Sequence, residues 1–163
     1  SGSQSVNHLD EDYDGSVPDI IDNGFAIVDF DNGARAMLEL CMFAEGSTYQ
    51  EEISAVGPNG KIEALVPGPQ RFWPVDLGPA PTPKLIVSPR HNKGPVTQDI
   101  PVDETLLAAG DHNGSTFFQH QRFLELVRGD RAEPEVSLHD GWAAVRLGQA
   151  AQASAATGQA VTL

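Results

Sequence analysis

Two apolar stretches, each broken by a glycine-containing turn, dominate the first part of the chain. Residues 25–30 (FAIVDF) are rich in β-forming side chains, DNG at 31–33 is a typical hairpin turn, and the apolar run resumes over 34–42. A second pair, 52–56 and 61–66, is joined by Gly-Pro-Asn-Gly, where proline fixes φ and glycine supplies positive φ. The pattern therefore predicts two antiparallel hairpins.

Alternation along 34–42 divides its side chains between two faces. One face carries Ala36, Leu38, Leu40 and Met42, and the other carries Arg35, Met37, Glu39 and Cys41. We expect the first face to be buried. The second is only half polar, so it is suited to packing against another subunit or domain.

Residues 67–101 contain nine of the twelve prolines. KLIVS at 84–88 nevertheless predicts a strand, so this region is a long excursion with one sheet element in it. Two interpretations stay open: a functional loop, because loops of this length usually have a role, and a solvated connector stiffened by proline.

The hydrophobic period changes to that of a helix in the last third. Thr116 and Gln119 form a capping-box pattern ahead of a helix of about thirteen residues that ends at Gly129. Ser137 and Asp140 begin a longer helix that ends at Gly158, and QAVTL beyond it predicts a final strand. The order of elements predicts one α+β domain over 1–163, in which helices cover one face of an open, mostly antiparallel sheet and the other face is free for oligomerisation.

Charge and composition narrow the classes of partner. The formal charge of −13 repels nucleic acid. No long apolar run predicts a membrane span. The start of the chain shows no secretory leader, and the single cysteine rules out an intrachain disulfide. We therefore expect a cytoplasmic protein, although the absence of disulfides does not by itself establish a reducing compartment.

Most motifs that could carry chemistry have a simpler explanation. Asp10, Asp12 and Asp14 with Gly15 resemble the start of a calcium loop, but Ile21 stands where the bidentate glutamate belongs, so an acidic turn is favoured. The Arg-Gly-Asp tripeptide at 128–130 matches an ordinary helix end. No metal-binding pair of histidines, nucleophile elbow or phosphate-binding glycine loop occurs. We therefore assign no catalytic, cofactor-binding or metal-binding residue.

Three polar residues are candidates for substrate contact: His112, Asn113 and His8. The first two lie in DHNGST just before the predicted helix, where backbone N–H groups attract anionic or hydroxyl-rich ligands. A purely structural role in the turn is the alternative.

The order of the pieces resembles one family. VDFDNGARAMLELCMFAEG, EEISAVGPNGKIEALVPG, STFFQHQRFLELVRGD and EVSLHDGWAAVRLGQAAQASAATGQAVTL follow one another as in the C-terminal domain of the Gfo/Idh/MocA oxidoreductases (glucose-fructose oxidoreductase, inositol dehydrogenase and rhizopine catabolism). The likeness covers about residues 6–163. Its most specific parts are the strand pair around DNG, the turn at 56–61 and the ending over 140–161.

This resemblance implies a parent enzyme with an N-terminal Rossmann domain that binds NAD or NADP. Hydride would pass between the nicotinamide and a sugar, cyclitol or related alcohol, and the open sheet would form the subunit interface. The family's Lys-Pro motif and Asp/His pair match no position here, so no catalytic residue is carried over. On this interpretation the fragment alone is inactive and does not bind the cofactor.

A second hypothesis comes from a different class. A noncatalytic interaction or scaffold domain could keep this fold without the chemistry, because fold does not dictate function. A strand followed by Gly-x-Gly-x-x-Gly upstream would favour the enzyme.

Overall fold

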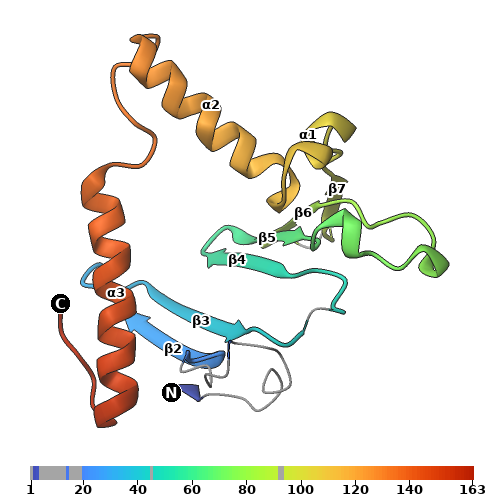
Figure 1. Cartoon of the computed structure of the whole chain (residues 1–163). Coiled ribbons are helices and arrows are strands. Elements are labelled where there is room, and N and C mark those ends of the chain that lie inside the picture. The colour runs from blue at the N-terminus through green and yellow to red at the C-terminus, as the bar shows by residue number, and fades with distance from the viewer. Residues whose placement is uncertain (1, 4–13, 15–19, 45, 92–93) are drawn as a thin grey trace. The chain divides into compact units, whose positions relative to one another are not determined.

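The computed structural model describes residues 2–3, 14, 20–44, 46–91 and 94–163. The chain forms two compact units, one from residues 1–44 with 136–163 and the other from residues 45–135. Each unit has its own open antiparallel sheet and at least one helix (Figure 1). The predicted α+β class is therefore confirmed, with the strands divided between two sheets.

The sheet of the first unit is built around the predicted DNG hairpin. Its strands, in spatial order, are β1 (Gly2–Ser3), β2 (Asn23–Asp29) and β3 (Arg35–Cys41). At the turn, the N–H of Phe30 donates to the carbonyl of Ala34 at 2.9 Å, and Gly33 adopts a φ of 83°. Only glycine reaches this φ at no steric cost, so the sequence fixes the turn and with it the register of the pair.

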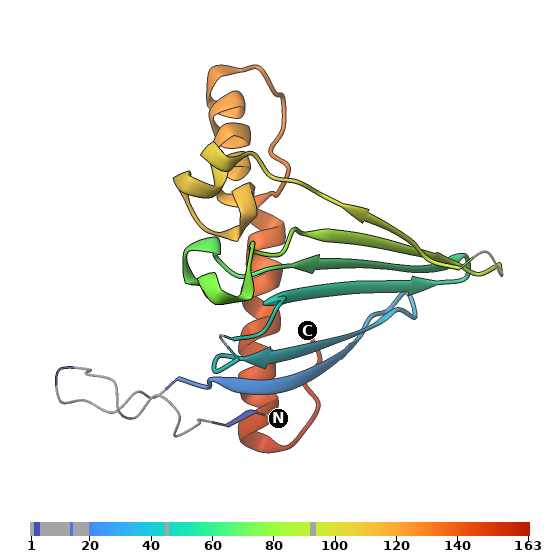
Figure 2. The ribbon, with the colours of Figure 1, turned by 90° about the vertical axis from the view of Figure 1, so that its right-hand side faces the viewer.

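Helix α3 (Leu138–Thr157) crosses one face of this sheet (Figure 2). The predicted capping box is confirmed: Ser137 Oγ accepts the N–H of Asp140 at 3.2 Å, and Asp140 Oδ2 accepts the N–H of Ser137 at 2.8 Å. Gly158 ends the helix with a φ of 69°. The final strand predicted over 159–163 is wrong, since these residues are irregular. A strand needs a ladder partner, which β propensity alone does not supply.

The predicted burial of one face of residues 34–42 is also wrong. Every residue of β3 is exposed, and Leu38 keeps 61% of its surface. Alternation is visible instead in β2, where Ala26 and Val28 are half-buried while Phe25 and Ile27 are exposed. A single helix crossing a small sheet covers too little of it to bury β3. Cys41 is exposed at the end of β3.

The sheet of the second unit is a four-stranded meander. Its strands are β4 (Glu51–Gly57), β5 (Gly60–Val66), β6 (Lys84–Pro89) and β7 (Val96–Asp99), paired in chain order and all antiparallel. The predicted second hairpin and the predicted strand at 84–88 are confirmed. The short polar strand β7 was not predicted, because its pairing with β6 comes from the fold and not from its own pattern.

This unit also has two short helical turns between β5 and β6 and three helical segments after β7. They are the 3₁₀ turns η1 (Gln70–Phe72), η2 (Val75–Leu77) and η3 (His112–Gly114), and the α-helices α1 (Glu104–Ala109) and α2 (Ser115–Arg128). The predicted helix α2 and its end at Gly129 are confirmed. Its predicted Thr116–Gln119 capping box is wrong. Gly114 occupies the N-cap position and makes no side-chain hydrogen bond there, because the helix begins before Thr116.

The Arg-Gly-Asp tripeptide forms the end of α2, as the sequence indicated. Gly129 has a φ of 82°, and its N–H donates to the carbonyl of Leu126 at 3.1 Å. The N–H of Asp130 donates to Glu125 O at 2.9 Å.

Within the described part of the chain, no helix is both long and apolar enough to cross a bilayer.

Candidate functional site

Three consecutive side chains ahead of α2 bind two distant segments of the second unit. Asp111 Oδ1 accepts a hydrogen bond from Nη1 of Arg71, His112 Nδ1 lies 3.0 Å from Oε1 of Glu51, and Asn113 Nδ2 donates to the carbonyl of Pro67 at 2.8 Å. These partners lie 40, 61 and 46 residues away in sequence. The turn is therefore where the start of β4, the segment after β5 and the loop before α2 meet.

The backbone of this turn is unusual. His112, Asn113 and Gly114 have φ values of 61°, 51° and 86°, three successive left-handed residues. Glycine adopts this region freely and asparagine tolerates it, but for other residues it costs about 1–2 kcal/mol. Such strain persists only where the surrounding structure holds it, and it is concentrated at functional sites. Here the contacts of Asp111, His112 and Asn113 with Arg71, Glu51 and Pro67 hold it.

A small pocket of about 160 Å³ opens beside the turn. Its lining combines polar side chains with the apolar side of α1: Pro69, Gln70, Arg71, Leu107, Ala108, Gly110, Asp111 and Asn113. Complete small-molecule sites usually measure about 300–1,000 Å³. The volume therefore suits part of a ligand, a few carbons with their hydroxyl groups, held against one wall.

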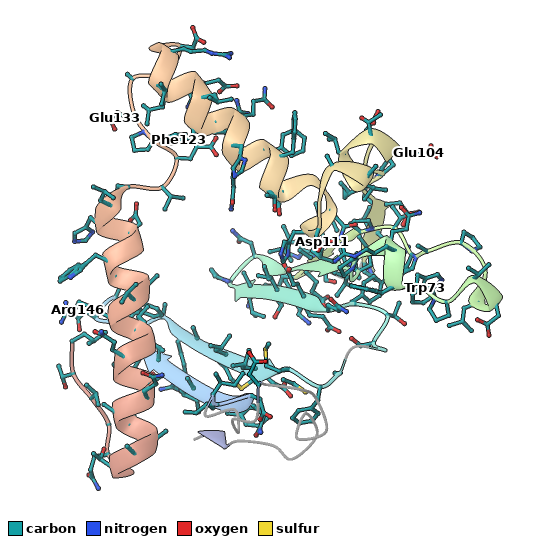
Figure 3. All side chains as sticks on the ribbon, in the orientation of Figure 1. Trp73, Glu104, Asp111, Phe123, Glu133 and Arg146 are labelled. Atoms are coloured by element: carbon teal, nitrogen blue, oxygen red, sulfur yellow. The ribbon has the colours of Figure 1, made fainter. Side chains whose placement is uncertain are left out.

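One ion pair lines this pocket, and a histidine–carboxylate contact lies at the same turn outside its lining. Arg71 pairs with Asp111 and also lies over the ring of Phe72, with its Cζ 4.4 Å from the ring centroid. The imidazole of His112 faces Glu51, and these two side chains are 63% and 50% exposed. Figure 3 shows Asp111 at the loop before α2 and Trp73 farther along the segment that follows β5. The indole Nε1 of Trp73 donates to the carbonyl of Gly78 at 3.2 Å, which holds that segment in a closed loop.

Gly68 allows the segment after β5 to pass close to β4. A Cβ built at this glycine would lie 2.4 Å from Cδ of Gln50, so any other residue would push Gln50 aside. The proline-rich excursion thus supplies one side of the pocket through Pro69, Gln70 and Arg71.

Two of the three candidate residues predicted from the sequence lie together at this turn. Asn113 lines the pocket, and His112 is next to it in the chain. His8 lies outside the described residues, as does most of the Asp10–Gly15 calcium-like segment. Among the residues that are described, no three His, Cys, Asp or Glu side chains gather as a metal site would require.

Three residues of this site were not predicted from the sequence: Glu51, Arg71 and Asp111. Asp111 could have been found, because it directly precedes the two predicted residues. Glu51 and Arg71 carry no local signal, since only the fold brings them to the turn.

A comparison with known protein families shows which family the chain belongs to. A family model, the C-terminal alpha/beta domain of the oxidoreductase family that includes the Gfo/Idh/MocA proteins, matches residues 2–163. The chain belongs to this oxidoreductase family. The match extends over both units, so the family resemblance identified in the sequence is confirmed for the whole fold. No curated protein matches the chain significantly.

The nicotinamide cofactor associated with this family does not fit the residues described here. Dinucleotide sites need a strand that leads through a glycine-rich turn into a helix within a parallel sheet. All strand pairs in the described residues are antiparallel. The described residues therefore contain no such dinucleotide-binding arrangement.

Proposed function

We propose that this domain provides the substrate-contacting wall of an NAD(P)-dependent oxidoreductase that acts on a sugar, a cyclitol or a related alcohol. The family match supports the oxidoreductase class. The observation that carries the proposal is the convergence of Asp111, His112 and Asn113 with two distant segments, the start of β4 and the segment after β5, beside a small pocket. Ligand sites combine apolar lining with a few polar groups, as this pocket does, and strained turns held by their surroundings recur at functional sites.

The contacts of the turn leave hydrogen-bonding groups for a hydroxyl-rich ligand. Because a carboxylate only accepts, the Nδ1 that faces Glu51 carries the proton in this pair. In this tautomer Nε2 of His112 is an acceptor for a substrate hydroxyl. Asn113 uses one N–H for Pro67, so its second N–H and its Oδ1 remain for the ligand. These residues bind and orient, and none of them is assigned a role in the chemical step.

The proposal includes two protein partners. A Rossmann domain of the same protein would hold NAD or NADP, which accepts or supplies hydride. A second copy of this chain would cover open sheet surface, where Ile27, Met37 and Ile53 are 70%, 68% and 65% exposed. Neither nucleic acid nor membrane is expected as a partner, since the charge is −13. We place the protein in the cytoplasm.

Steady-state kinetics of the full-length gene product test this function. The wild-type protein is assayed with NAD and with NADP against D-glucose, D-galactose and myo-inositol. His112→Ala and Asn113→Ala should each raise KM about tenfold, which corresponds to about 1.4 kcal/mol, near the upper range for one hydrogen bond. His120→Ala is the matched control, because His120 is an exposed histidine on α2 of the same unit. Equal KM values for His112→Ala and His120→Ala would contradict the assignment of the turn.

A further inference from the structure

The two charged side chains that line the pocket form a pair. Arg71 is engaged by Asp111. The remaining polar side chains of the lining, Gln70 and Asn113, are uncharged amides. The lining of the pocket therefore offers hydrogen-bond donors and acceptors but no unpaired positive charge.

Within residues 46–91 and 94–135, the other lysine and arginine side chains of this unit either bind partners away from the pocket or lie far from it. Lys61 lies 2.7 Å from Glu63, and Lys84 lies 2.5 Å from Asp99. Arg122 and Arg131 share Glu125 and Glu135, and Arg90 donates to the carbonyl of Pro58 at the β4–β5 turn. Arg128 ends α2, a helix of 14 residues, and so lies about 20 Å from the turn at its start. None of them offers the pocket a free positive charge.

An anionic ligand group would meet two obstacles at this wall. It would compete with the Asp111 carboxylate for Arg71, and it would lie next to that carboxylate in the lining. The field of a chain with a formal charge of −13 opposes it at longer range. A hydroxyl group meets neither obstacle, and the apolar surface of Leu107 and Ala108 can cover the carbons that carry it.

We infer that the part of the substrate held by this wall is uncharged, so that the domain selects neutral polyols over their phosphorylated or carboxylated counterparts. The inference rests on the proposed function and narrows its substrate class. Arg71 is the decisive residue: it could bind an anion, and Asp111 prevents it from doing so.

Neutralising Asp111 tests the inference by a gain of function. The full-length protein is assayed for turnover and for ligand-induced Tm shift with two matched sets: D-glucose, D-glucuronate and D-glucose 6-phosphate, and D-galactose with D-galacturonate. Wild type should prefer the neutral member of a set at least about tenfold in kcat/KM. Asp111→Asn keeps the side-chain shape, frees Arg71 and should shift that preference at least about tenfold toward the anion.

Two controls separate the role of Arg71 from a general effect of charge. Asp76→Asn removes the same charge from an exposed position on η2 of the same unit and should leave the preference unchanged. The double variant Arg71→Gln/Asp111→Asn should lose the anion binding gained by Asp111→Asn. A Tm of each variant without ligand reports whether the fold is kept.

The outcomes distinguish this inference from the proposed function. A wild-type protein that prefers the anionic member, or an Asp111→Asn variant with unchanged preference, overturns the inference and leaves the oxidoreductase intact. Failure of every compound to bind or react overturns the proposed function and the selectivity with it.

Discussion

At the turn before α2, the identity of single residues decides the geometry. Asn113 combines a left-handed backbone, with φ and ψ of 51° and 41°, and a hydrogen bond to Pro67. Asparagine is one of the few non-glycine residues that tolerate this region. His112 has the same backbone hand without that tolerance, so the turn stores strain that its contacts must offset.

Substitution at Asn113 separates these two contributions. Asn113→Gly keeps the left-handed backbone and loses only the amide hydrogen bond, whereas Asn113→Ala loses the hydrogen bond and strains the backbone. We expect the free energy of unfolding to fall in the order wild type, Asn113→Gly, Asn113→Ala, with about 1 kcal/mol between the two variants. Denaturant titration measures it. An alanine variant as stable as the glycine variant would mean that the turn relaxes to another backbone conformation.

Sequence reasoning reached only part of this site. His112 and Asn113 could be predicted because they are polar residues in a loop immediately before a helix, which is a local property. Glu51 and Arg71 could not, because their contacts span 61 and 40 residues and depend on how β4 and the segment after β5 are placed.

Among the secondary-structure elements, the β4–β5 hairpin has a glycine at each end of its turn, and only one of these positions requires glycine. Gly60 has a φ of 143°, and a Cβ built there would lie 2.3 Å from the carbonyl oxygen of Ser88 on β6. Gly57 at the other end of the turn has nothing within 4 Å of such a Cβ among the described atoms. One glycine is therefore required by its neighbour strand and the other is not.

Alanine at these two positions should have very different effects. Gly60→Ala should destabilise the protein by more than about 2 kcal/mol, because it combines backbone strain with a clash against β6. Gly57→Ala should stay within about 1 kcal/mol of wild type. Thermal unfolding compares the pair, and similar losses of stability in both variants would contradict the β5–β6 register.

The capping box of α3 makes the stability of this helix depend on pH. Hydrogen bonds from the Ser137 hydroxyl and backbone N–H lower the pKa of Asp140 from its ordinary value of 3.8. A lowered folded-state pKa gives stability that is present above 3.8 and is lost as the pH falls through the folded-state pKa.

Asp140→Asn keeps the shape of the cap and removes the charge, so it isolates this contribution. The variant should unfold more easily than wild type at about pH 7, and the difference should shrink as the pH falls below 3.8, the ordinary pKa of the group, and through the folded-state pKa of Asp140. Helix content followed by circular dichroism during denaturation measures both. A difference that is unchanged or larger in acid would show that the carboxylate does not act through the cap.

Local signals explain which elements could be predicted. The two hairpins and the ends of α3 were predicted correctly because glycine, serine and aspartate there satisfy nearby backbone groups. The Thr116–Gln119 capping box was wrong because Gly114 and its left-handed backbone start α2 earlier. Strand β7 and the short helix α1 were missed because tertiary pairing and a single N-cap, Asp103, sustain them.

For the whole molecule, the main feature is apolar surface that the described chain does not bury. Among the described residues, the only buried apolar side chain is that of Pro67, although chains of this size usually bury a core. The pattern of the sequence predicted the α+β class and open antiparallel strands. It could not predict how strands divide between two sheets, because sheet membership depends on non-local pairing.

The proposed homo-oligomer follows from this surface. The protein should self-associate in light scattering, and Met37→Asp should weaken association by placing a charge on β3, where Met37 is 68% exposed. Val75→Asp is the control, since Val75 is 93% exposed on η2, outside both sheets. A strictly monomeric mass at high protein concentration, or equal effects of the two variants, would count against an interface on the β1–β3 sheet.

The central claim, that this domain serves a nicotinamide-dependent oxidoreductase of neutral polyols, is tested most directly by following hydride. The full-length protein is incubated with NAD or NADP and with D-glucose, D-galactose or myo-inositol carrying deuterium on the carbinol carbons, and the reduced nicotinamide is analysed by mass spectrometry. We predict deuterium in the reduced cofactor from at least one of these substrates, with slower transfer by His112→Ala. Folded protein that transfers no deuterium from any of them to either cofactor would contradict the claim and favour a noncatalytic interaction domain.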